Sequence, residues 1–164
     1  MKKRGEVNIA IANYLYNNSN NIVKNINNNF NTNDINHIII GRLYYGIYLI
    51  AKDYLINNCN YVTKCIKRNT CDFYKNNTCD LECLKHKTYT NVKKHKHKPS
   101  LWEELANNIS QFPVNENKNT IKTCGEHFAE LRESYEYHPT YCNRSRVIIA
   151  NNFYNRIFGV LNVK

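Results

Sequence analysis

The longest apolar run of this chain lies in the segment INHIIIGRLYYGIYLIAKDYLI, residues 35–56. Its apolar residues recur at helical spacing and cover most of the circumference of a helix, and Asp34 stands where it can cap the first turn. A helix that is apolar nearly all round must be surrounded by other elements. The segment therefore predicts the central helix of a bundle, with these residues buried: Ile39, Leu43, Tyr44, Ile47, Ile50, Ala51, Tyr54 and Leu55.

Four further segments show helical periodicity, and they predict helices over residues 7–26, 101–109, 120–138 and 143–161. The helix at 101–109 follows a capping box made by Ser100 and Glu103. The apolar positions of the first helix are Val7, Ile11, Tyr14, Leu15, Ile22 and Val23; those of the third are Trp102, Leu105 and Ile109; those of the last are Val147, Ala150, Tyr154, Ile157 and Leu161.

The predicted fold class is all-α, because no segment alternates apolar and polar residues over the length of a strand. We expect an antiparallel bundle of about five helices, with residues 57–99 as a basic, Cys-rich insertion between the second and third. A chain of 164 residues can form one domain with a sizeable core, so residues 1–164 are expected to be a single domain.

Positive charge dominates the chain, whose formal net charge is +10. Residues 57–99 hold ten Lys or Arg and three acids, and therefore contribute about seven of these charges. Such an excess favours a polyanionic partner, and nucleic acid is the commonest. Lys93, Lys94, Lys96 and Lys98 are candidate RNA-binding residues that suit contacts to phosphates, and a solvated loop is the alternative interpretation of this stretch.

The cellular compartment of a protein determines whether its cysteines form disulfides. Arg42, Lys52 and Asp53 interrupt the longest apolar run, so no membrane contact is expected, and the first residues lack a signal-cleavage site. The sequence thus predicts a cytoplasmic protein, in which free thiols or a metal site are expected rather than disulfides. Five of the seven cysteines, with His86, crowd one region: Cys59, Cys65, Cys71, Cys79 and Cys83.

Zinc is an open alternative for this cluster, but structural zinc sites show two tight Cys pairs. Only Cys79-x3-Cys83 has that spacing, so we predict free thiols, no metal and no other cofactor. Cys124 stands on the apolar line of its helix and is expected in the core.

The segment LRESYEYHP, residues 131–139, places Arg132 six residues before His138. Arginine binds phosphate through a planar fork of donors, and histidine exchanges protons near neutral pH. The two are candidate catalytic residues for cutting a phosphodiester without metal. We expect Phe128, Leu131 and Tyr135 to form a buried stripe with Arg132 and His138 on its two shoulders. A surface ion pair between Arg132 and Glu136 is the alternative.

Three segments together resemble the HEPN superfamily of small helical bundles, in matching order and spacing. They are Gly41-Arg42-Leu43-Tyr44-Tyr45-Gly46-Ile47-Tyr48 with Ala51-Lys52; His97-Lys98-Pro99-Ser100-Leu101-Trp102 with Leu105; and Leu131-Arg132 through Glu136-Tyr137-His138-Pro139. Ala150 supplies the small residue that the family tends to place in its last helix. The resemblance covers roughly residues 5–56 and 97–160.

This resemblance implies a metal-independent endoribonuclease whose Arg-x4–6-His site, here Arg132 and His138, is assembled across a homodimer. It also implies a toxin or antiviral-defence role, with a nucleotidyltransferase-like antitoxin or CRISPR-associated components as partners. The ending Glu136-Tyr137-His138-Pro139 resembles members without demonstrated nuclease activity, so a non-catalytic HEPN module that binds a protein or nucleic acid is the alternative. A small-ligand or nucleotide-binding bundle is a third hypothesis.

Overall fold

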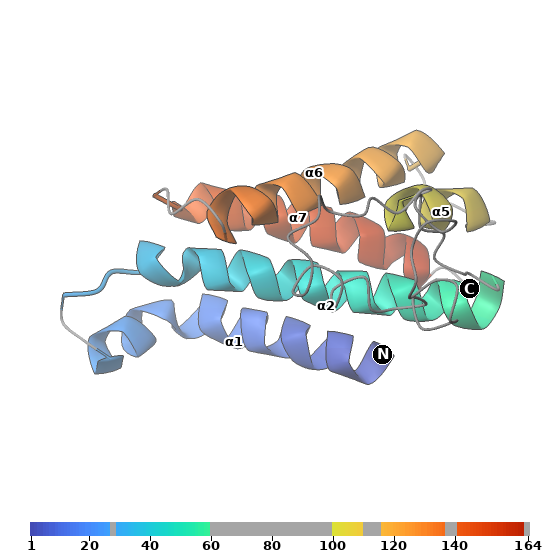
Figure 1. The fold of residues 1–164 in the computed structure, drawn as a ribbon. Coiled ribbons are helices and arrows are strands. Elements are labelled where there is room, and N and C mark those ends of the chain that lie inside the picture. Colours follow the sequence, from blue (N-terminus) through green and yellow to red (C-terminus); the bar gives the residue numbers. More distant parts are fainter. Residues whose placement is uncertain (27–28, 60–99, 110–115, 137–140, 163–164) are drawn as a thin grey trace, which may run out of the picture.

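The computed structural model describes residues 1–26, 29–59, 100–109, 116–136 and 141–162. These residues form five helices and no strand: α1 (Lys2–Ile26), α2 (Asn33–Cys59), α5 (Leu101–Asn108), α6 (Lys118–Glu136) and α7 (Arg144–Leu161). The long helices α1 and α2 run in opposite directions, as do α6 and α7 (Figure 1). The predicted all-α class is confirmed, although residues 57–59 belong to α2. The rest of the predicted insertion, residues 60–99, lies outside the described residues.

Capping side chains explain where two of the helices begin. Ser100 caps α5 as predicted, because its hydroxyl accepts a hydrogen bond from the Glu103 N–H at 3.1 Å. Asn143 caps α7, and its amide oxygen accepts from the Arg146 N–H. Asp34 was wrongly expected to cap α2, since α2 already begins at Asn33. Asn31 accepts from the Asn33 N–H at 2.8 Å, while the Asp34 carboxylate accepts from the Asn31 N–H at 2.6 Å.

Helix α2 lies at the centre of the structure and contacts each of the other four helices (Figure 1). Its predicted buried positions are confirmed, except that Tyr54 is half-buried. The exposed residues of α2 include Ile38, Arg42 and Tyr45, which share one strip of the helix at helical spacing. This arrangement follows from the apolar circumference of the segment, which needs neighbours on most sides.

Helix α1 packs against α2 through small residues, and only some of its apolar positions turn inward. Val7, Ile11 and Tyr14 are exposed. The buried residues of α1 are Gly5, Asn8, Ile9, Ala12, Ser19 and Val23. The cause is a close backbone approach, since a Cβ added at Gly5 would meet the Gly46 carbonyl oxygen at 2.7 Å. The face with the least side-chain bulk therefore turns toward α2.

We expect Gly46→Ala to lower the free energy of unfolding by about 1–3 kcal/mol, because the added methyl group overpacks a tight contact. A Cβ at this position would lie 2.5 Å from Cγ1 of Ile9 and 3.0 Å from the Gly5 oxygen. Gly41→Ala is the matched control in the same helix, because its Cβ would meet nothing within 4 Å. Alanine there should be neutral or stabilising by up to about 1 kcal/mol. Urea denaturation of both variants measures the difference, and equal effects would contradict the close contact.

Helices α5 and α6 join through Trp102, which is 4% exposed. The predicted apolar face of α5 is confirmed, since Leu105 and Ile109 are also buried. Trp102 packs edge-on against Tyr44 and Tyr48 of α2, with ring centroids 6.1 and 6.2 Å apart. On α6 the indole lies over Gly125, where a Cβ would be 2.2 Å from a ring carbon. Cys124 is buried beside this contact, as predicted.

Gly125→Ala should therefore destabilise the protein by about 1–3 kcal/mol, because a buried indole cannot move aside cheaply. The control is Gly159→Ala in α7, where an added Cβ would meet nothing within 4 Å. Thermal unfolding followed by circular dichroism compares the two. An unchanged midpoint for Gly125→Ala would contradict the packing of Trp102 on α6.

Two polar contacts fix α7 against the first two helices. Asn36 of α2 is fully buried, and its amide donates to the Cys142 carbonyl oxygen at 2.8 Å. Arg144 donates to the Tyr16 carbonyl oxygen of α1 at 3.1 Å and covers the Tyr16 ring. The predicted apolar line of α7 is buried at Val147, Ala150 and Ile157 and half-buried at Tyr154 and Leu161. No helix in the described part of the chain is long and apolar enough to cross a membrane.

Candidate functional site

Arg132 lies near the end of α6 and is only 9% exposed. The buried line of α6 runs through Ile121, Cys124 and Phe128, and Arg132 continues it one turn later. The predicted placement was therefore wrong in detail: Leu131 and Tyr135 are half-buried, while Arg132 occupies the stripe itself rather than its shoulder.

Two tyrosines of α2 hold the Arg132 guanidinium. Its Nη2 donates a hydrogen bond to the Tyr45 hydroxyl at 2.7 Å. The guanidinium carbon lies 4.9 Å from the centre of the Tyr45 ring and 5.6 Å from that of Tyr44. Cations are attracted to the faces of aromatic rings at such distances, more strongly where water is excluded. The charge of Arg132 is thus fixed in position before any ligand binds.

Tyr44 connects this cluster to the core. Its ring packs edge-on against Phe128 of α6 and against Tyr45, with centroids 5.5 and 5.8 Å apart. Burial raises the pKa of the Tyr44 hydroxyl far above its usual range, with neighbouring Tyr48 acting in the same direction and Arg132 opposing it. Tyr44 therefore stays neutral at all physiological pH values and serves as packing for the guanidinium.

Tyr45 is the group of this cluster that reaches solvent, with 40% of its surface exposed. It shares the outer strip of α2 with Arg42, whose Nη1 donates to the Asn8 amide oxygen of α1 at 2.9 Å. Tyr45 received no role in the sequence analysis, because its segment is typical of a core helix. The sequence signal that could have identified Tyr45 is its hydroxyl-bearing ring, which lies on the same side of α2 as Arg42.

The other predicted site residues lie outside the described residues. His138 follows the last described residue of α6, and its position relative to Arg132 stays a prediction. The same holds for the side chain of Glu136, the alternative ion-pair partner, and for four candidate RNA-binding residues: Lys93, Lys94, Lys96 and Lys98.

Three cysteines are described, and all are free thiols: Cys59, Cys124 and Cys142. Burial raises the pKa of Cys124 and of Cys142 to about 11, so both thiols are protonated near neutral pH. Cys59 ends α2 half-buried, and its possible zinc-binding neighbours lie outside the described residues: Cys65, Cys71, Cys79, Cys83 and His86. Among the residues that are described, no three His, Cys, Asp or Glu side chains converge on a point that could hold a metal ion.

Comparison of the chain with protein-family models, curated proteins and solved structures finds no match. A fixed guanidinium beside a half-exposed tyrosine can bind an anionic group and can donate charged hydrogen bonds to it. Among the predicted site residues, His138 is the one whose side chain could serve as a general acid or base.

Proposed function

We propose that this protein is a HEPN-type, metal-independent endoribonuclease with Arg132 and His138 as its catalytic residues. The observation that carries the proposal is the guanidinium of Arg132, held by the Tyr45 hydroxyl at 2.7 Å and by two aromatic rings at the end of α6. A charge fixed in this way needs no reorganisation when charge develops on a reacting phosphate. The net charge of +10 supports RNA as the polyanion.

In the proposed reaction the 2′-hydroxyl of RNA attacks the neighbouring phosphorus. His138 takes the proton from this hydroxyl or gives one to the departing 5′-oxygen, and each role is typically worth roughly 10²–10⁴-fold in rate. Arg132 stabilises the negative charge on the phosphorane-like transition state. The products are a 2′,3′-cyclic phosphate and a 5′-hydroxyl, and DNA is not cut because it lacks the nucleophile.

A homodimer would complete this site, since one subunit's His138 could act as base and the other's as acid. Lys93, Lys94, Lys96 and Lys98 would contact RNA phosphates without reading sequence. A toxin or antiviral-defence role, with a nucleotidyltransferase-like antitoxin or CRISPR-associated components as partners, is the biological setting that we propose for this activity.

The second candidate is a non-catalytic HEPN module that binds a protein partner or nucleic acid. The burial of Arg132 favours it, because a side chain that is 9% exposed and packed on two rings can act purely as a structural link between α2 and α6. The two candidates differ in whether His138 is required for an effect on RNA.

We expect the wild-type protein to cleave single-stranded RNA in EDTA and to leave cyclic-phosphate ends. His138→Ala should lose at least about 10²-fold of this activity, because the general acid or base is removed. His37→Ala is the matched control, since His37 is an exposed histidine of α2. Gel analysis of labelled RNA measures the rates. Equal cleavage by all three proteins, or none by the wild type, would contradict the ribonuclease and favour the binding module.

A second prediction concerns Tyr45, which we expect to position Arg132. Tyr45→Phe keeps the ring under the guanidinium but removes the hydroxyl that accepts from Nη2. The cleavage rate should fall by about 10-fold, while the free energy of unfolding changes by only about 1 kcal/mol. Tyr14→Phe serves as the control, because Tyr14 is 63% exposed on α1. Undiminished cleavage by Tyr45→Phe would show that this hydrogen bond does not serve the reaction.

A further inference from the structure

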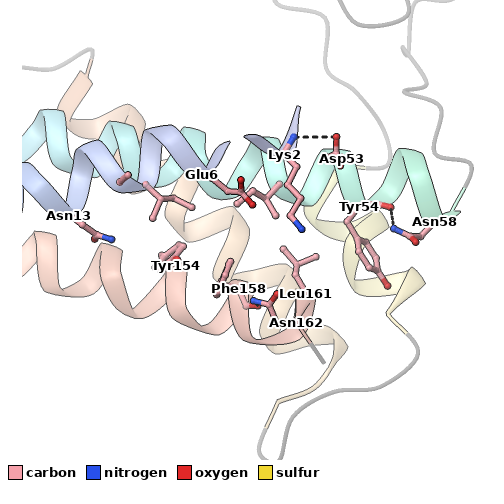
Figure 2. A pocket seen from close by; sticks show the side chains of 13 residues that line it. Lys2, Glu6, Asn13, Asp53, Tyr54, Asn58, Tyr154, Phe158, Leu161 and Asn162 are labelled. Atoms are coloured by element: carbon pink, nitrogen blue, oxygen red, sulfur yellow. Dashed lines mark hydrogen bonds between the residues drawn. The ribbon is translucent and has the colours of Figure 1, made fainter. Parts of the chain in front are cut away.

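A cavity of about 480 Å³ lies between α1, α2 and α7 (Figure 2). Neither Arg132 nor Tyr45 lines it. Helices α1 and α7 both pack on α2, but no Cα atom of α1 lies within 8 Å of one of α7. The most buried residues of the lining are Ile9 and Ile50, which are 8% and 6% exposed. The volume falls within the range of small-molecule sites.

The wall supplied by α7 is aromatic. Tyr154 and Phe158 stand one turn apart, and their rings stack with centroids 5.4 Å apart and an interplanar angle of 28°. Burial raises the pKa of Tyr154, so its hydroxyl is neutral near pH 7. These two rings and the aliphatic residues Ile9 and Ile50 offer an apolar surface to the flat body of a ligand.

The wall supplied by α1 is polar and carries both signs of charge. Lys2, Glu6, Ala10 and Asn13 recur at helical spacing and line the cavity together (Figure 2). Within the described part of the chain, neither the Lys2 ammonium nor the Glu6 carboxylate takes part in an ion pair or hydrogen bond. Two opposite charges thus face one cavity without neutralising each other.

Asp53, the third charged residue of the lining, is already engaged. Its carboxylate accepts from the Lys2 backbone N–H at 3.2 Å and lies 3.3 Å from the Met1 ammonium group. Glu6 is therefore the carboxylate that is open to a cationic ligand group, and the Lys2 ammonium is the group that is open to an anionic one. A ligand that carried both charges could pair with both side chains.

We propose that this cavity binds a small zwitterion with an aromatic or similarly flat apolar body, in the manner of an aromatic amino acid. Its ammonium group is held by Glu6, its acid group by Lys2, and its apolar body lies against Tyr154 and Phe158. The site is separate from the Arg132 cluster, and the proposal does not depend on the ribonuclease.

Isothermal titration calorimetry with three related probes tests the proposal: tryptophan, tryptamine, which lacks the acid, and indole-3-propionate, which lacks the amine. Tryptophan should bind most tightly, because it alone can satisfy both charges. Glu6→Gln should weaken tryptophan binding by about 10-fold or more, which is the usual effect of losing a charged hydrogen bond. It should leave the affinity for indole-3-propionate nearly unchanged.

Two further variants test whether tryptophan binds in this cavity and through Glu6. Ala10→Trp places a large ring in the cavity from an exposed position of α1 and should abolish binding without unfolding the protein. Glu130→Gln, an exposed carboxylate of α6, is the matched control for Glu6→Gln and should bind as the wild type does. Absence of tryptophan binding, or binding that survives both Glu6→Gln and Ala10→Trp, would overturn the proposal.

Discussion

Helix α2 is apolar on most of its circumference, so the other helices must cover it. α1, α5, α6 and α7 each pack against it. A close backbone approach at Gly5 and Gly46 draws α1 tightly onto α2, while α1 and α7 have no Cα atoms within 8 Å of each other. On the opposite flank of α2, Tyr44 and Tyr45 meet α6 at Phe128 and Arg132. The cavity and the arginine cluster both result from how the neighbouring helices pack on α2.

Helix positions could be predicted from sequence because periodicity is a local property that long segments repeat. Residues 35–56 fall within α2, residues 144–161 of the predicted segment 143–161 form α7, and Ser100 caps α5 as expected. The buried face of α1 could not be predicted in the same way. Its sequence offers two alternative faces, one with Val7, Ile11 and Tyr14 and one with Ile9 and Ala12. The contact that selects between them joins Gly5 to Gly46, which lie far apart in sequence.

The candidate site also combines features that the sequence predicts with features that it does not. The sequence identifies Arg132 as a phosphate-binding residue type, but a charged residue on an amphipathic helix is expected at the boundary of the apolar stripe. In the structure Arg132 is buried because aromatic side chains of α2 pack against it. The Tyr45 hydroxyl that accepts its hydrogen bond lies 87 residues away in sequence. No local pattern records such a pairing. The contributions of His138 and of the lysines at 93–98 stay predictions, since these residues are not described.

Burial gives Arg132 a fixed charge and at the same time restricts access to it. With 9% of its surface exposed, Arg132 presents little of its side chain to solvent. A phosphate that reached it would meet Tyr45 first, because that side chain is 40% exposed and already accepts from Nη2. The ring and hydroxyl of Tyr45 therefore control how much of the Arg132 guanidinium a phosphate can reach. Because the Tyr45 hydroxyl accepts from Nη2, the cation polarises it, and the two side chains together set the electrostatic potential of this surface.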